Sequence, residues 1–327
     1  MGHHYLNQLF SPKSIAVFGA SESPDSVGTL VFKNLLDAGF KGSLYPINPK
    51  HAKVQELECF PNLTALNKPV ELAVIATPAN TVPSIIQQCG EHNVKGAIII
   101  SSGFSEAGIK GQRLQKDMVE IAQQYGVHII GPNCMGVMRP AAGLNATYSR
   151  STAKPGNLAL VSQSGGMCTA ILDWAAARQI GFSSVVTLGD TADVDFGDVL
   201  DFLALDPKTD SILLYIESVD DARSFMSGLR TASRMKPVVV LKAGRSEEAS
   251  KAASTHTGAI VGSNEAFNAA LERAGVVRVD NINQLFSAAQ ILSSGLRVQQ
   301  NRLLIMTNGG GPGVMATDKG SGTGFRM

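Results

Sequence analysis

Short, uninterrupted apolar runs alternate with helix-like stretches along most of this 327-residue chain. In the first half the apolar runs have the length of strands and lie at residues 14–18, 44–47, 72–76, 97–100 and 127–130. Helical stretches separate them, at 27–38, near 80–90 and at 110–125. Strands that are apolar throughout are buried on both faces, which is typical of a parallel sheet covered by helices on both sides. The pattern therefore predicts an α/β fold.

The alternation is interrupted over residues 139–156 and then starts again, so we place a domain boundary there. Strands are expected at 158–161, 183–188, 211–216 and 237–242, with helices at 165–178, 197–205, 220–232, 264–274 and 281–293. The stretch 243–262 is rich in Gly, Ala, Ser and Thr and has no apolar stripe. Long segments of this kind inside a compact domain are usually either functional or a sign that the elements have been wrongly assigned. We predict two α/β domains, over residues 1–140 and 150–296.

The last part of the chain predicts the start of a further unit. Residues 302–307 suit a strand, and residues 308–313 form a glycine-rich turn that resembles a phosphate loop. The helix expected from Val314 ends in the Gly- and Ser-rich residues 320–324. Because one strand and half a helix cannot bury their own apolar face, we expect residues 300–327 to be the truncated start of a third α/β domain.

Composition excludes several classes of protein. The chain has 28 Lys and Arg against 27 Asp and Glu, without the basic excess of a nucleic-acid-binding protein. No apolar run approaches the roughly 20 residues of a membrane span, and the N-terminus has no secretory signal pattern. The four cysteines lack metal-binding spacing and indicate free thiols in a reducing compartment. We expect a cytoplasmic protein with no metal site, no nucleic-acid partner and no membrane partner.

The turn after the first strand, Gly19-Ala20-Ser21, is a candidate nucleotide site, because ligands bind at the carboxyl ends of parallel strands and phosphates at helix N-termini. The second strand ends in Asn48-Pro49-Lys50, where an NAD-binding protein would carry Asp or Glu for the ribose hydroxyl. A lysine there suits a phosphate on the ribose. The two motifs favour a phosphorylated nucleotide other than NAD. A plain tight turn and an NADP-binding protein remain the alternatives.

Three further strand ends of the first domain carry small or hydroxylated residues, which would let an extended ligand lie close to backbone N–H groups. They are Thr77-Pro78, Ser102-Gly103 and Asn133-Cys134. Cys134 also suggests a nucleophile, but no partner histidine is evident in the sequence. A small, packed thiol is the interpretation we favour for it.

In the second domain, Ser164 can cap the helix that follows, and Gly165 and Gly166 leave its first N–H groups open. This combination predicts an anion site, for which phosphate is the natural occupant, and an ordinary helix cap is the alternative. The spacing is not that of a G-x-S-x-G motif, which disfavours a hydrolase nucleophile.

Among the six histidines, His256 alone lies in the middle of the long segment of small residues, where an imidazole could act as a nucleophile. Glu217 follows the strand at 211–216. Its carboxylate could orient the imidazole through Nδ1–H and leave Nε2 to attack phosphorus, although a capping or surface role is also open. Four aspartates cluster before the helix at 197, and we favour a helix N-terminal role over Mg²⁺ binding: Asp190, Asp193, Asp195 and Asp198.

Three motifs occur together in this chain: Gly19-Ala20-Ser21 with Asn48-Pro49-Lys50, then Ser162-Gln163-Ser164-Gly165, then Gly244-Arg245-Ser246 running to Ser254-Thr255-His256-Thr257-Gly258. Together they resemble the NDP-forming (ADP-forming) acyl-CoA synthetases, relatives of the succinyl-CoA synthetase α subunit. The resemblance extends over about residues 8 to 318. It implies a Rossmann-like CoA-binding domain followed by a flavodoxin-like ligase domain. It also implies that His256 is the phosphohistidine, that Glu217 is its supporting carboxylate, and that the strand ends of the first domain line a CoA groove.

The resemblance implies a three-step reaction. Phosphate attacks acyl-CoA to give acyl phosphate and CoA, and His256 then takes the phosphoryl group and frees the acid. Phosphohistidine passes it to ADP in an ATP-grasp domain, where ADP or ATP and Mg²⁺ would bind. That domain is absent from this sequence, so we expect the chain alone not to make ATP and to need the domain in cis or in trans. A short-chain acyl-CoA such as acetyl-CoA is the expected substrate. The association of related α and β parts makes an oligomer possible.

One departure from the family pattern leaves a second hypothesis open. Leu188-Gly189-Asp190 has Asp where many synthetases carry Asn. Residues 171–174 and 221–225 also resemble the bacterial protein lysine acetyltransferases, which fuse this module to a GNAT-type domain. The alternative function is therefore a CoA or acyl-CoA sensor that regulates an acetyltransferase. Some of those proteins have lost the active histidine. Here His256 is kept, which favours a competent phosphorylation site.

Overall fold

The computed structural model describes residues 4–244, 264–296 and 299–327. The chain divides into two compact units, Met1–Ser293 and Ser294–Met327. His256 and most of the segment predicted to carry the chemistry lie outside the described residues. Within the described part, no helix combines the length and apolar character needed to cross a membrane.

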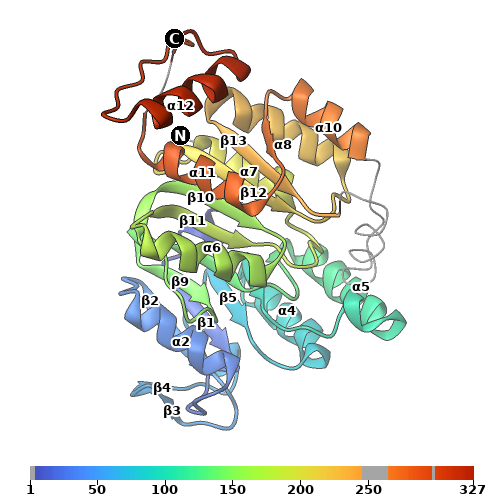
Figure 1. Ribbon diagram of the computed structural model, residues 1–327. Helices are drawn as coiled ribbons and strands as arrows, with labels where there is room; N and C mark the ends of the chain where they lie inside the picture. The colour runs from blue at the N-terminus through green and yellow to red at the C-terminus, as the bar shows by residue number, and fades with distance from the viewer. Residues whose placement is uncertain (1–3, 245–263, 297–298) are drawn as a thin grey trace. The chain divides into compact units, whose positions relative to one another are not determined.

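The first sheet of the larger unit is parallel throughout and has the strand order β2-β1-β5-β6-β7 (Figure 1). Its central strands are buried along their whole length, which explains their uninterrupted apolar sequence. This arrangement confirms the Rossmann-like α/β sheet. The strands are β1 (Ser14–Phe18), β2 (Ser43–Ile47), β5 (Leu72–Ile75), β6 (Gly96–Ile99) and β7 (His128–Ile130). The main connecting helices are α2 (Val27–Asp37), α4 (Val82–Glu91) and α5 (Ile109–Tyr125). The shorter elements are β3 (Lys53–Val54), β4 (Leu57–Glu58), α3 (Leu63–Leu66), η1 (Ala79–Thr81) and η2 (Ser105–Ala107).

The second sheet is mixed, with the strand order β14-β13-β12-β10-β11-β8-β9. Five of its strands are parallel to one another, and β8 and β9 form an antiparallel hairpin at one edge, with β8 antiparallel to β11. The strands are β8 (Gly136–Arg139), β9 (Leu144–Thr147), β10 (Pro155–Ser162), β11 (Phe182–Thr187), β12 (Ser211–Ile216), β13 (Val238–Lys242) and β14 (Val277–Val279).

The hairpin formed by β8 and β9 begins the second sheet at residue 136, ahead of the boundary expected at 139–156. Its turn contains Pro140 and Gly143, and Gly143 has a φ of +65°. In the sequence these residues indicate a break, and the structure uses them in the short 3₁₀ turn η3 (Pro140–Ala142) that joins two fully buried strands. The expected parallel sheet therefore carries an antiparallel edge.

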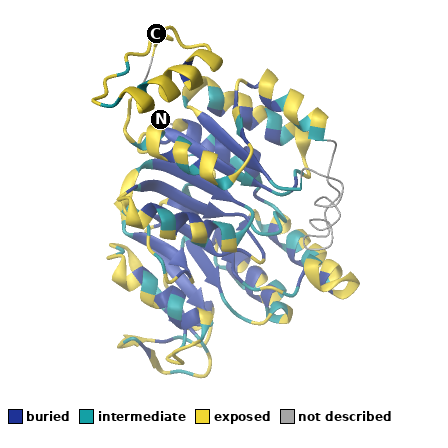
Figure 2. Ribbon diagram, viewed as in Figure 1, coloured by how far each residue is buried: buried dark blue, intermediate teal, exposed yellow. Residues whose placement is uncertain are grey.

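Helices cover both faces of the second sheet (Figure 1). On one face, α6 (Gly165–Ala177) and α11 (Ile282–Ser293) pack against β10, β12 and β13. On the other, α7 (Phe196–Leu205), α8 (Ala222–Met235) and α10 (Asn264–Arg273) contribute to a second cluster. The two large sheets form the buried interior, and exposed residues lie on the outer helix faces and in loops (Figure 2).

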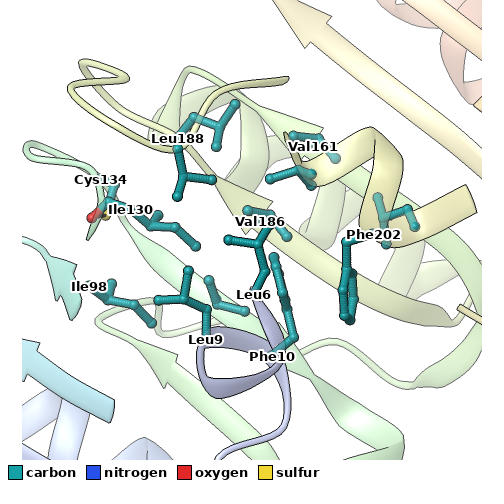
Figure 3. Close-up of a cluster of buried hydrophobic side chains, with 14 of the residues drawn as sticks. Leu6, Leu9, Phe10, Ile98, Ile130, Cys134, Val161, Val186, Leu188 and Phe202 are labelled. Carbon is teal, nitrogen blue, oxygen red and sulfur yellow. Dashed lines mark hydrogen bonds between the residues drawn. The ribbon is translucent and has the colours of Figure 1, made fainter. Parts of the chain in front are cut away.

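A four-residue helix near the N-terminus, α1 (Asn7–Phe10), links the cores of the two sheets. Leu6, Leu9 and Phe10 are at most 1% exposed and lie between residues of both sheets (Figure 3). The Phe10 ring stacks on Phe202 of α7 with ring centroids 4.3 Å apart. The side chains of α1 therefore fill the space between the first and second sheets.

The smaller unit contains α12 (Gly310–Gly322) and an isolated β-bridge between Arg302 and Arg326. The strand expected over residues 302–307 is therefore wrong for the described chain. A strand needs a partner along its length, and here only one bridge forms. Leu304 and Met306 are 82% and 86% exposed. The helix begins at Gly310 instead of Val314, and it includes the Gly- and Ser-rich residues up to Gly322.

Candidate active site

The carboxyl ends of three neighbouring parallel strands, β10, β11 and β12, open into a cavity of about 320 Å³. The four residues predicted to bind phosphate or support the histidine line it, Ser164, Gly165 and Gly166 after β10 and Glu217 after β12. We call this space the phosphate cavity. Its other lining residues are Asn133, Met135, Tyr148, Gln163, Gly189, Asp190, Thr191, Ser218 and Asp220.

The N-terminus of α6 forms one wall of the phosphate cavity. Ser164 is the N-cap, and its side chain accepts a hydrogen bond from the Met167 N–H at 3.3 Å, as the sequence predicts for a cap. Cβ atoms placed on Gly165 and Gly166 would meet nothing closer than 3.6 Å and 4.0 Å. Neither glycine is closely packed at the start of this 13-residue helix, and the positive end of the helix dipole suits an anion there.

Three carboxylates also line the phosphate cavity: Asp190, Glu217 and Asp220. Burial, together with the neighbouring Glu106 carboxylate, raises the pKa of Asp190 to about 6. Hydrogen bonds from Ser105 Oγ (2.7 Å) and Asn133 Nδ2 (3.2 Å) to the Asp190 carboxylate act in the opposite direction. Asp190 is therefore mostly ionised at pH 7, and the neutral acid becomes the main form only below about pH 6.

The remaining aspartates of the predicted cluster have structural contacts. Asp195 caps α7, and it exchanges backbone-to-side-chain hydrogen bonds with Asp198 in a capping box. Asp193 accepts a hydrogen bond from the Ile129 N–H at 2.8 Å. The helix-terminal interpretation is thus confirmed for Asp195 and Asp198. Across residues 4–244, 264–296 and 299–327, no group of three or more His, Cys, Asp or Glu side chains is arranged to hold a metal ion.

A larger cavity of about 620 Å³ lies at the carboxyl edge of the first sheet. Residues from three of the five first-domain motifs line it. They are Gly19, Ser21, Asn48, Pro49, Lys50, Thr77 and Pro78. Gly19 has a φ of +84°, and a Cβ on Gly28 would lie 1.9 Å from the Gly19 oxygen, so the loop rests directly on α2. Asn48 Nδ2 donates to the Ala20 oxygen at 2.8 Å and joins the two loops.

The other predicted residues lie elsewhere. Ala20 is fully buried, and Ser102 and Gly103 form the turn after β6 outside the residues that line this cavity. Asn133 lines the phosphate cavity instead. Cys134 is buried, its thiol donates to the Ile99 oxygen at 3.3 Å, and burial raises its pKa to about 12. These contacts agree with a packed thiol.

Several residues that line the two cavities belong to none of the predicted motifs, because tertiary packing alone brings them there. In the phosphate cavity they include Met135 and Tyr148, which come just before β8 and just after β9. In the larger cavity they include His51, Thr81 and Gln88. Only the folded arrangement of strand ends and neighbouring helices reveals them.

Comparison with known proteins connects both cavities to one family. Residues 13–140 match the family model of a CoA binding domain, and residues 155–292 match the family model of a succinyl-CoA ligase like flavodoxin domain. The chain is 41% identical over 326 residues to the acetate–CoA ligase [ADP-forming] I subunit alpha of Pyrococcus furiosus, and the match covers 98% of this chain and 71% of that subunit. The chain belongs to the ADP-forming acyl-CoA synthetase family. This membership confirms the resemblance seen in the sequence.

A further ligase matches in sequence, and a solved synthetase matches in fold. The acetate–CoA ligase [ADP-forming] I of Archaeoglobus fulgidus is 44% identical over 313 residues, and the match covers 96% of this chain and 45% of that enzyme. The acetyl-coenzyme A synthetase 1 of Ca. Korarchaeum cryptofilum, solved with phosphate and ADP, superposes with a TM-score of 0.94 at 38% identity, covering 98% of this chain and 69% of the other. The chain thus spans under half of one relative and about 70% of the others. These relatives are named as ligases or synthetases and give the acetyltransferase alternative no support.

Proposed function

We propose that this chain is the CoA-binding and phosphohistidine-bearing part of an ADP-forming synthetase of short-chain acyl-CoA, which interconverts acyl-CoA, ADP and phosphate with acid, ATP and CoA. One observation carries the proposal: the Ser164-capped start of α6 and the Glu217 carboxylate line the same cavity. The names of the relatives, acetate–CoA ligases and an acetyl-CoA synthetase, support the reaction and the short acyl chain.

In the first step, CoA would lie along the larger cavity, with its phosphates toward Gly19, Ser21 and Lys50. Inorganic phosphate would bind at the N–H groups of Gly165 and Gly166. A phosphate oxygen attacks the thioester carbonyl, the C–S bond breaks, and CoA leaves as a thiolate that takes a proton. The product is acyl phosphate, still held at the helix N-terminus.

In the second step, Nε2 of His256 would attack phosphorus, and the P–O bond to the acyl carboxylate would break to release the acid. Glu217 would accept the Nδ1–H hydrogen bond and stabilise the charged imidazole, as a carboxylate does in other histidine pairs. Phosphohistidine would then donate its phosphoryl group to ADP in an ATP-grasp domain, which we expect in cis or in trans. ADP or ATP and Mg²⁺ belong to that domain, and a cytoplasmic location stays a prediction.

The test separates the two steps. The protein is incubated with acetyl-CoA and ³²P-labelled phosphate, and both free CoA thiol and acid-labile label on the protein are measured. We expect thiol release that depends on phosphate, with label on the wild type. His256→Ala should still release thiol but carry no label. Thiol release without phosphate, or label on the His256→Ala variant, would contradict the proposal.

A further inference from the structure

Side chains from two neighbouring strands hold the backbone of Glu217. β12 ends one residue before Glu217 and lies between β10 and β13 in the sheet. Gln163 directly follows β10, and Lys242 is the last residue of β13. Lys242 is the register partner of Ile216, so its backbone lies beside the carboxyl end of β12. Both side chains can therefore reach the Glu217 peptide groups, one from each side.

Gln163 holds the N–H side of this turn. Its Oε1 accepts hydrogen bonds from the Glu217 N–H at 2.6 Å and from the Ser218 N–H at 2.9 Å. Its Nε2 is 3.3 Å from Ser218 Oγ, to which it donates. One side chain thus satisfies two consecutive backbone donors at the point where the chain leaves the sheet.

Lys242 holds the carbonyl side. Its Nζ donates to the Glu217 carbonyl oxygen at 2.7 Å and also to the Ala243 carbonyl oxygen. Within the described part of the chain, no hydrogen bond engages the Glu217 carboxylate, which lines the phosphate cavity. The backbone of Glu217 is therefore held from both sides at a point where its side chain lines the phosphate cavity.

Local packing does not favour a lysine at position 242. The residue is only 7% exposed, and burial together with the nearby Arg278 charge lowers the pKa of its ammonium group. Burying an ammonium group is costly, and an apolar side chain of similar size would avoid that cost. The cost of burying this ammonium group is offset by its two carbonyl partners, one of which belongs to Glu217, and by the charge of Glu217, which favours the protonated form.

We propose that Gln163 and Lys242 are positioning residues, which form a backbone clamp on Glu217 and hold its carboxylate in place for phosphoryl transfer. This rests on the proposed function, in which Glu217 orients the histidine that receives the phosphoryl group. A displacement of about 1 Å in a catalytic group can cost about 100-fold in rate. Loss of the clamp should therefore slow transfer much more than it weakens binding of acyl phosphate.

The experiment measures the rate at which acetyl [³²P]phosphate labels the protein, over a range of concentrations. Lys242→Met should lower the rate at saturation by about 10- to 100-fold, with the half-saturating concentration changed by less than about threefold. Gln163→Ala, a second variant in case Lys242→Met does not fold, should act in the same direction. Its Glu217 and Ser218 amides should also exchange with solvent deuterium faster.

Lys236→Met is the matched control. Lys236 is also partly buried and donates from Nζ to two carbonyl oxygens, those of Leu203 and Asp206 at 2.6 Å, but it precedes β13 at the other edge of the sheet. Burial lowers the pKa of its ammonium group too. Lys236→Met should lose stability and label within about twofold of the wild-type rate, since it touches nothing in the phosphate cavity.

A double-mutant cycle with Glu217→Ala distinguishes positioning from general damage. Once the carboxylate is gone, Lys242→Met should slow labelling no further, whereas a structural defect would add its full effect. Labelling of Lys242→Met and Gln163→Ala at the wild-type rate, or full additivity with Glu217→Ala, would overturn the clamp and leave the proposed function standing. Absence of label on the wild type would overturn the proposed function, and the clamp with it.

Discussion

Replacing Asp190 by asparagine should change how the stability of the protein depends on pH. The folded-state pKa of Asp190 is about 6, against an ordinary value of 3.8. Below pH 4 the carboxyl is protonated in both the folded and the unfolded chain and has no effect. Between about pH 4 and pH 6 the unfolded chain loses this proton while the folded protein keeps it, so stability falls as the pH rises. Above about pH 6 both the folded and the unfolded chain are ionised at this position, and stability falls no further on account of Asp190.

The size of this loss follows from the difference between the two pKa values. A difference of about two pH units corresponds to about 3 kcal/mol at full strength. The carboxylate is partly exposed to solvent, so screening reduces the figure to about 1–2 kcal/mol. The side-chain amide introduced by Asp190→Asn does not ionise. Its oxygen can accept from Asn133, and its NH₂ group can donate to the Ser105 hydroxyl, which rotates to accept.

The assay is urea denaturation of wild type and Asp190→Asn across pH 4 to 8, followed by circular dichroism. The free energies of unfolding should be similar at pH 4, and the variant should become more stable by about 1–2 kcal/mol above pH 6. Titrating groups remote from Asp190 cancel in the difference between the two proteins, and Glu106, which interacts with Asp190, contributes to the same pH-dependent difference. A difference that stays constant from pH 4 to 8, or that favours the wild type at high pH, would refute the reasoning.

Three further predictions follow from buried contacts. Leu9→Ala should lower the free energy of unfolding by about 2–5 kcal/mol because it empties space between the sheets, whereas Leu205→Ala, at a residue 67% exposed, should change it by less than about 0.5 kcal/mol in urea denaturation. Gly28→Ala should weaken CoA binding by about tenfold or more in calorimetry, because the added Cβ would displace the Gly19 loop. The control Gly310→Ala should leave CoA binding unchanged, because an added Cβ there has nothing within 4 Å. Cys134 should resist Ellman's reagent at pH 8 until the protein is unfolded, since its thiol is buried with a pKa of about 12.

The alternation of apolar strands and helices predicted most of the fold, because a parallel strand buried on both faces leaves an unbroken apolar run. The elements that were missed are those whose signal is tertiary. The hairpin of β8 and β9 contains Arg139, Pro140 and Gly143 and so resembled a linker. Helix α1 has four residues, too few for a helical period, and becomes ordered because Leu9 and Phe10 are buried between the sheets.

The candidate site was predicted where local chemistry is enough. Ser164 with Gly165 and Gly166 is a cap and an open helix end on consecutive residues, and Glu217 stands at a strand end on the same edge of the sheet. The roles of Gln163 and Lys242 could not be read in this way. Their partners are backbone groups 54 and 25 residues away, and only the order of the strands brings them together.

The most direct test of the account is to find where the phosphoryl group goes. The protein is treated with acetyl phosphate, digested under neutral conditions and mapped by mass spectrometry. We predict one phosphoryl group on His256, strongly reduced in Glu217→Ala and retained in Leu205→Ala. A protein that carries no phosphoryl group, or that carries it on another residue while His256 stays unmodified, would contradict the assignment of the phosphate cavity.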